Sequence, residues 1–267
     1  MNINLKNNLK VIPDKKSRSL LPNTLTIIGV CIGLSSIKFA LDSRFDLSII
    51  ALTFSAIIDT LDGRVARLIK GTSQVGKELD SLTDVISFGV APAFVMYFWY
   101  LNTLGKIGWL LSLIYVVCVA LRLARFNIHN NENPSWRDNF FEGVPSPAGA
   151  GLVLLPLIFE KSNFYFNNEY NNLITSSLFI IIPLLMISKI PTYSLKKIII
   201  PRNTTVFLLF SIGLYFGLLI FFTFKILFVT GVIYLLFIPI SAIHYKKLKK
   251  ERKDIDNFDD EIHEDML

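Results

Sequence analysis

Four aspartates between residues 59 and 84 are the side chains in this sequence best suited to chemistry. Asp59 and Asp62 are three residues apart, and Asp80 and Asp84 are four apart. In a helix, each pair lies on one face. If the two helices form an antiparallel pair, the four carboxylates converge on one point. Carboxylates this close cannot all stay ionised in a low dielectric without a cation, so the pattern predicts a metal centre.

The residues around these aspartates indicate which metal and which substrate fit. The ligands are all hard oxygens with no cysteine or histidine nearby, which favours Mg²⁺ or Mn²⁺ over Zn²⁺. Two such ions side by side would clamp phosphate oxygens during an in-line displacement. Gly63, Ala66 and Gly76 share the aspartate faces and leave room for a large charged ligand. Arg67 adds a planar fork suited to phosphate, so the cluster fits a pyrophosphate.

The aspartates border apolar stretches, and these stretches must position them. Of 267 residues, 52% are hydrophobic and 18% charged, and 14 of the charged residues fall between Lys246 and Asp265. A soluble enzyme needs charge over its whole surface, so that class is excluded. The two cysteines both lie in apolar runs, which also excludes a disulfide-stapled secreted domain. Eight stretches suit membrane helices: roughly 25–41, 47–58, 85–101, 107–121, 148–159, 173–187, 206–222 and 226–243. We therefore expect an all-α, polytopic transmembrane helical bundle of about eight spans.

The basic residues indicate how such a bundle is oriented. With eight spans, both termini share one side, and 22 of the 27 lysines and arginines fall on that side. The positive-inside rule then places both termini in the cytosol and the aspartate cluster at the cytosolic face of a cell membrane. The net charge of +6 is accordingly interpreted as a topology signal beside anionic headgroups, not as a nucleic-acid surface.

Three segments follow from these patterns. Residues 1–22 are polar and basic and are expected to form a cytosolic interfacial segment, with no cleaved signal peptide. Residues 23–245 are expected to form the transmembrane catalytic domain. Residues 246–267, a basic block followed by an acidic one, are expected to be a disordered cytosolic tail.

The spacing of the aspartate cluster resembles that of a known family. The string Asp59-x2-Asp62-Gly63-x2-Ala66-Arg67-x8-Gly76-x3-Asp80-x3-Asp84 matches, at every position, the signature of the CDP-alcohol phosphotransferase family. Members of that family are polytopic membrane enzymes that move a phospho-alcohol unit from a CDP-alcohol onto a second alcohol and release CMP. The resemblance implies the same chemistry for this chain.

The resemblance also implies roles for individual residues. Two divalent cations, Mg²⁺ or Mn²⁺, are implied to bind the four aspartates of the signature, Asp59, Asp62, Asp80 and Asp84. Asp84 is implied to take the proton from the acceptor hydroxyl as well. The CDP moiety is implied to lie against Gly63, Ala66, Arg67, Ser73, Gly76 and Asn23, the last in the string Pro22-Asn23-x2-Thr26. A homodimer is compatible with the resemblance.

Further strings resemble the integral-membrane branch of the family that uses serine, the phosphatidylserine synthases. They cover residues 87–92, 122–127, 143–148 and 188–191. This likeness implies CDP-diacylglycerol as the donor, L-serine as the acceptor and a bacterial inner membrane as the location. Residues after Pro201 carry no motif that assigns them a role.

A serine acceptor needs a cation for its carboxylate. Arg122 and Arg125, three residues apart at the end of the fourth stretch, could bind that carboxylate while the hydroxyl points at Asp84. Asn127 could help to orient the ligand. The arginines are interpreted equally well as positive-inside anchors, and Asn127 as a helix cap.

Two alternatives stay open. Glycerol 3-phosphate or inositol could replace serine as the acceptor in the same reaction. A divalent-cation transporter, a function of a different class, would also explain intramembrane aspartates. It would not explain the small residues on their faces, nor their clustering at one interface instead of the midplane.

Overall fold

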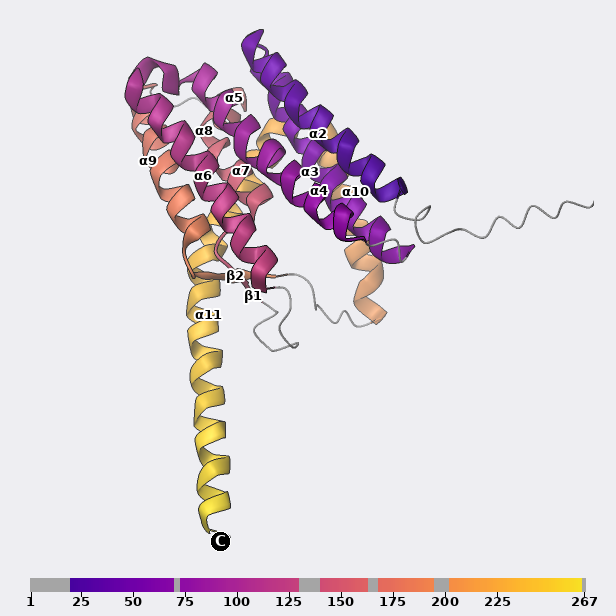
Figure 1. Ribbon diagram of the computed structural model, residues 1–267, viewed down its shortest axis with the longest axis vertical. Helices are drawn as coiled ribbons and strands as arrows, with labels where there is room; N and C mark the ends of the chain where they lie inside the picture. The colour runs from indigo at the N-terminus through magenta and orange to yellow at the C-terminus, as the bar shows by residue number, and fades with distance from the viewer. Residues whose placement is uncertain (1–19, 70–72, 130–139, 163–167, 195–201, 266–267) are drawn as a thin grey trace, which may run out of the picture.

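The described part of the chain is a bundle of helices with a short two-stranded sheet at one end (Figure 1). The computed structural model describes residues 20–69, 73–129, 140–162, 168–194 and 202–265. The expected interfacial segment 1–22 lies outside this part except for its last three residues, which begin the first described helix. The elements are α2 (Leu20–Leu41), α3 (Phe45–Leu68), α4 (Gln74–Asp84), the π-helix η1 (Val85–Val90), α5 (Ala91–Trp99), the 3₁₀-helix η2 (Leu101–Leu104), α6 (Lys106–His129), β1 (Phe140–Glu142), α7 (Ser146–Val153), α8 (Leu155–Lys161), α9 (Asn168–Ile187), β2 (Pro191–Tyr193), α10 (Arg202–Phe221) and α11 (Thr223–Asp265).

The apolar stretches all fall in helical elements, which makes the chain a multi-pass helical membrane protein. Five helical segments within the described ranges are long and apolar enough to cross a bilayer: Leu20–Leu41, Gln74–Trp99, Lys106–Ile128, Thr204–Phe221 and Thr223–Lys249. The other three stretches fall short of that standard. The C-terminal half of α3 is charged, residues 148–159 are divided between α7 and α8, and the apolar part of α9 covers only Leu173–Ile187. The count of eight spans and the cytosolic side of both termini therefore stay predictions.

The C-terminal segment, expected to be a disordered tail, overlaps the last described helix, and the tail expectation stays a prediction. The helix α11 continues from the apolar run through the basic and acidic blocks to Asp265, and it projects away from the bundle (Figure 1). The segment contains no glycine or proline after Pro239, and its basic block is rich in lysine, a good helix former. Extending an existing helix also avoids the cost of nucleating a new one. A charge-rich composition therefore does not prevent helix formation here.

A stripe of small residues on α2 sets how closely α2 approaches its neighbours. The buried positions on this helix include Thr26, Gly29, Gly33, Ser36 and Ala40, which recur every three or four residues. In a membrane, small residues let helix backbones approach, and hydroxyl groups join them. The Ser55 hydroxyl of α3 donates to the Gly29 carbonyl at 2.9 Å, and the Ser48 hydroxyl donates to the Ser36 carbonyl. This packing places the first turns of α2 beside the charged half of α3.

The helix that begins at Gln74 changes its winding directly after Asp84. Residues Val85–Val90 form a π-helix, and the Ala91 N–H donates to the Ile86 carbonyl five residues earlier. The Tyr115 hydroxyl of α6 donates to the Phe88 carbonyl of this segment at 2.7 Å. On the other side, a Cβ at Gly33 of α2 would lie 2.6 Å from Ser87 Oγ, so only glycine permits this approach. The segment is therefore held from two sides.

The hydrophobic core joins the middle of the bundle to α11. Fully buried side chains from α5, α6, α8 and α9 meet there, among them Met96, Tyr115, Leu157 and Phe179. The strands β1 and β2 pair antiparallel, with Phe140 opposite Tyr193, and α11 packs against β2 and α8. This contact brings residues from the end of the chain beside the interior of the bundle.

Candidate active site

Three of the predicted carboxylates meet in space. Asp59, Asp62 and Asp80 each offer an oxygen atom, and these atoms all lie within 4.8 Å of one another. Two come from the end of α3 and one from the middle of α4. Asp62 is only 3% exposed. Such a set of hard oxygen donors fits a divalent cation, because the mutual repulsion of the carboxylates needs positive charge to balance it.

The fourth carboxylate, Asp84, lies one turn beyond Asp80 at the end of α4. It interacts electrostatically with Asp59 and Asp80, and also with Arg122 of α6. Its Oδ1 atom is buried and has no hydrogen-bond partner among the described residues. A buried carboxylate oxygen of this kind is suited to bind a cation or a substrate group.

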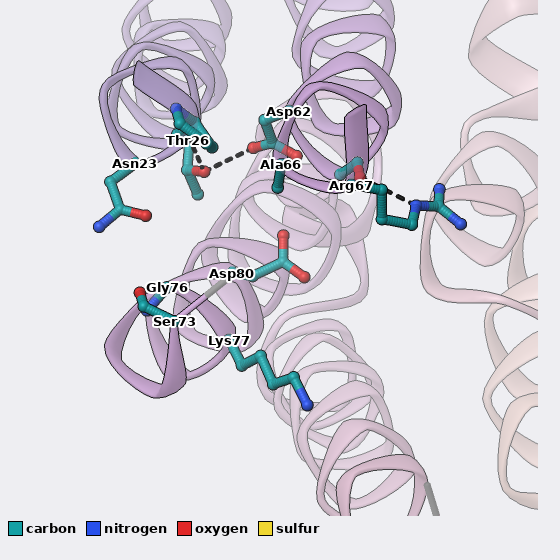
Figure 2. Close-up of a pocket in the computed structure, with 11 residues that line it drawn as sticks. Asn23, Thr26, Asp62, Ala66, Arg67, Ser73, Gly76, Lys77 and Asp80 are labelled. Carbon is teal, nitrogen blue, oxygen red and sulfur yellow. Dashed lines mark hydrogen bonds between the residues drawn. The ribbon is translucent and has the colours of Figure 1, made fainter. Parts of the chain in front are cut away.

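Asp62 is fixed by the small-residue stripe of α2. The Thr26 hydroxyl lies 2.6 Å from Asp62 Oδ2, and both side chains are buried (Figure 2). The same hydroxyl lies 3.0 Å from the Pro22 carbonyl, which holds Thr26 within its own helix. This contact leaves the other carboxylate oxygen of Asp62 available to a ligand. Thr26 was included in a sequence string but had no predicted role, since nothing in the sequence indicated a contact between positions 36 residues apart.

A pocket opens from Asp62 and Asp80 between the start of α2, the end of α3 and the start of α4. Figure 2 shows the two carboxylates facing each other across it. All six residues predicted to contact the CDP moiety line this pocket, together with Lys77, Pro22 and Thr26: they are Asn23, Gly63, Ala66, Arg67, Ser73 and Gly76. Lys77 was not among the predicted site residues, although it directly follows Gly76. A cation at this position is a natural neighbour for phosphate.

Some of these residues also have contacts within the protein. Ser73 is the N-cap of α4, and its hydroxyl accepts a hydrogen bond from the Gly76 N–H at 3.0 Å. A Cβ at Gly76 would lie 2.9 Å from Asn23 Oδ1 and 3.0 Å from Ser73 Oγ, so the absence of a side chain there keeps three candidates packed together. The Arg67 Nε donates to the Gly63 carbonyl at 3.0 Å, and its guanidinium points away from the two aspartates in Figure 2. The side chain is exposed and therefore free of steric restraint by the core.

The three residues predicted to bind the acceptor lie in different surroundings. Arg122 is 9% exposed, interacts with Asp84, and donates from Nη1 to the Ser146 hydroxyl of α7 at 2.7 Å. Arg125 Nη1 donates to the Ile187 carbonyl at the end of α9 at 2.6 Å. Asn127 is exposed and donates from Nδ2 to Ser81 Oγ of α4 at 2.9 Å. Arg122 is thus placed to interact electrostatically with Asp84 of the carboxylate cluster.

Comparisons with known proteins identify the family of this chain. The family model described as CDP-alcohol phosphatidyltransferase matches residues 19–233. A protein of Mycobacterium leprae named CDP-diacylglycerol–serine O-phosphatidyltransferase is 36% identical over 239 residues, covering 85% of this chain and 76% of the relative. Proteins of the same name from Helicobacter pylori and Methanocaldococcus jannaschii are 38% and 41% identical over 179 and 174 residues. These two matches cover 67% and 64% of this chain, and 74% of each relative.

Proposed function

Because the chain belongs to the CDP-alcohol phosphatidyltransferase family, we propose that it transfers the phosphatidyl group of CDP-diacylglycerol to the hydroxyl of L-serine and releases CMP. The observation that carries the proposal is the meeting of Asp59, Asp62 and Asp80 beside a pocket lined by the family signature. Membership of a transferase family favours the enzyme over the cation transporter that the sequence left open. The names of the relatives support serine as the acceptor over glycerol 3-phosphate or inositol.

The pocket at the start of α2 and α4 is proposed to receive the nucleotide end of the donor. Arg67 and Lys77 bring positive charge to this pocket. Gly63 and Ala66 have little or no side chain and so leave space for the ligand. A separate apolar cavity lies between α3, α7 and α11; its lining includes Ala56, Phe88 and Leu227. Ala56 lies three residues before Asp59, about one helical turn, so an acyl chain in this cavity would start close to the reacting phosphate.

The four aspartates are proposed to hold two divalent cations, Mg²⁺ or Mn²⁺. Asp59, Asp62 and Asp80 provide oxygens within reach of a shared ion, and the unpaired Oδ1 of Asp84 is available beside them. When bound, such ions supply positive charge to the pyrophosphate oxygens and to the departing CMP. The Thr26 hydroxyl keeps Asp62 oriented for this role.

The reaction is proposed to be one direct displacement. Asp84 accepts the proton of the serine hydroxyl, the serine oxygen forms a bond to the lipid-linked phosphorus, and the bond from that phosphorus to the CMP oxygen breaks. Arg122 is proposed to hold the serine carboxylate close to Asp84. Arg125 and Asn127 are proposed to help bind the serine on the same side of the site. The chain's own contribution is thus a base, an anion-binding arginine and a shaped pocket, with no covalent protein intermediate.

The location of the site is part of the proposal. Eight spans with both termini in the cytosol would place the aspartate cluster at the cytosolic face of a cell membrane, most simply a bacterial inner membrane. CDP-diacylglycerol would then enter from the bilayer, and serine from the cytosol. A homodimer is compatible with this arrangement. Basic residues 246–253 would lie next to anionic headgroups on the same side.

The acceptor is tested by measuring CMP release from CDP-diacylglycerol with each alcohol offered separately. We expect release and a phosphatidylserine product with L-serine, and only background release with glycerol 3-phosphate or inositol. Product with glycerol 3-phosphate and none with serine would show that the proposed acceptor is wrong while leaving the family chemistry in place.

Replacing Gly63 with alanine tests where the donor lies. A Cβ built at Gly63 would have no protein atom of another residue nearby within 4 Å, so the folded protein should tolerate alanine there. If the CDP group fills that space, the added methyl should raise the KM for CDP-diacylglycerol about tenfold or more through overpacking. Gly217→Ala in α10, where a Cβ also meets nothing, is the matched control and should leave the KM unchanged. Equal KM values for both variants would mean that the donor does not contact Gly63.

A further inference from the structure

Beyond Asp84, the interior of the bundle holds polar groups that the protein itself does not pair. Arg122 of α6 is buried, and within the described ranges its one hydrogen bond runs from Nη1 to Ser146 Oγ of α7. Its Nε is buried without a hydrogen-bond partner in the described part of the chain. Ser146 is itself completely buried. A buried guanidinium normally has its donors satisfied, so an unpaired N–H is a candidate donor to an anionic ligand.

A second unpaired donor comes from the end of the chain. The Tyr234 hydroxyl of α11 is buried and has no hydrogen-bond partner among the described residues. It interacts with the side chain of Thr192, whose hydroxyl donates to the Gly143 carbonyl at 2.8 Å. Tyr234 also interacts electrostatically with Arg122. Tyr234 also lines the apolar cavity proposed to receive an acyl chain.

The unpaired atoms indicate which functional groups a small ligand at this place would carry. Two unused donors, Arg122 Nε and the Tyr234 hydroxyl, suit the oxygens of one carboxylate. The unused acceptor, Asp84 Oδ1, suits a hydroxyl on the same molecule. One buried cation balances one carboxylate charge, whereas a phosphate monoester would bring about two negative charges to it. The set therefore matches a small hydroxy acid better than a sugar phosphate.

We propose that Tyr234 is an acceptor-binding residue whose hydroxyl donates, alongside Arg122, to the carboxylate of serine. The inference rests on the proposed function and adds to it a residue of α11, a helix to which the sequence assigned no role. It makes the last helix part of the substrate site and gives the protein a means of selecting an acceptor that carries a carboxylate.

The test is Tyr234→Phe, which removes one oxygen and keeps the ring that packs in the cavity. We expect the KM for L-serine to rise about tenfold or more, as for loss of a hydrogen bond to a charged group. The kcat and the KM for CDP-diacylglycerol should change less than about threefold, since both substrates still bind in the same geometry. Tyr215→Phe is the matched control, because the Tyr215 hydroxyl contacts only Thr230, at 3.2 Å, between α10 and α11 among its described contacts. It should leave all three constants unchanged.

The outcomes separate this inference from the proposed function. A wild-type enzyme that releases no CMP with serine contradicts the proposed acceptor, and the inference with it. An enzyme active with serine whose Tyr234→Phe variant keeps the wild-type KM for serine contradicts the inference alone. The same holds if kcat and both KM values change together, because that pattern would report a general structural role for the tyrosine.

Discussion

Replacing Asp84 with asparagine is expected to lower the rate of CMP release by about 10²–10⁴-fold while CDP-diacylglycerol still binds. The amide has nearly the same shape as the carboxylate but cannot accept the proton of the acceptor hydroxyl. The other three aspartates, whose oxygens lie within 4.8 Å of one another, are unchanged and should still support donor binding. The measurement is the rate of CMP release at saturating serine, with binding of labelled CDP-diacylglycerol followed on the same preparation.

A neighbouring carboxylate provides the control for this variant. Glu78 lies on the same helix, α4, but is exposed and does not line the pocket. Glu78→Gln removes the same charge and should keep close to full activity. If Asp84→Asn loses binding and turnover to the same extent, Asp84 acts only as a ligand, and the proton must leave the acceptor by another route.

Removing divalent cations is expected to reduce activity to background, and adding Mg²⁺ or Mn²⁺ should restore it. The reason is the arrangement of Asp59, Asp62 and Asp80, which offers only carboxylate oxygens and cannot hold pyrophosphate without positive charge between them. The measurement is CMP release after treatment with a chelator and dialysis, followed by titration with each metal salt.

A direct binding measurement separates a metal site from a general effect of the chelator. Paramagnetic Mn²⁺ should bind the wild-type protein and bind much more weakly to Asp62→Asn and Asp80→Asn. Asp46→Asn, at the opposite end of α3, is the matched control and should bind Mn²⁺ like the wild type. Unaltered Mn²⁺ binding in the Asp62 and Asp80 variants would contradict the proposed metal centre.

The aspartate cluster could be predicted from sequence because its geometry is mostly local. Spacings of three and four residues put Asp59 with Asp62, and Asp80 with Asp84, on shared helix faces whatever the rest of the fold does. The apolar stretches could likewise be predicted to form helices. Long-range packing then brought the two pairs together, and the structure agrees with the expected convergence for Asp59, Asp62 and Asp80.

Other parts of the site could not be predicted, because they depend on contacts between distant segments. Thr26 reaches Asp62 only through the close packing of α2 on α3, and the role proposed for Tyr234 depends on the docking of α11. A lone tyrosine in an apolar run has no distinguishing pattern. The extent of α11 through the charged residues was not expected from composition, although residues 240–265 contain no glycine or proline.

The π-helix that follows Asp84 has a consequence for how the chain can vary. A turn of this kind is equivalent to an α-helix with one residue inserted, and each residue of an α-helix advances the chain by about 100° around its axis. Deleting a single residue from Val85–Val90 would restore regular α-helical winding. If α5 kept its place in the core, Asp84 would then be rotated about the helix axis and would point in a different direction. Deletions in this stretch should therefore be far less tolerated than substitutions that keep its length.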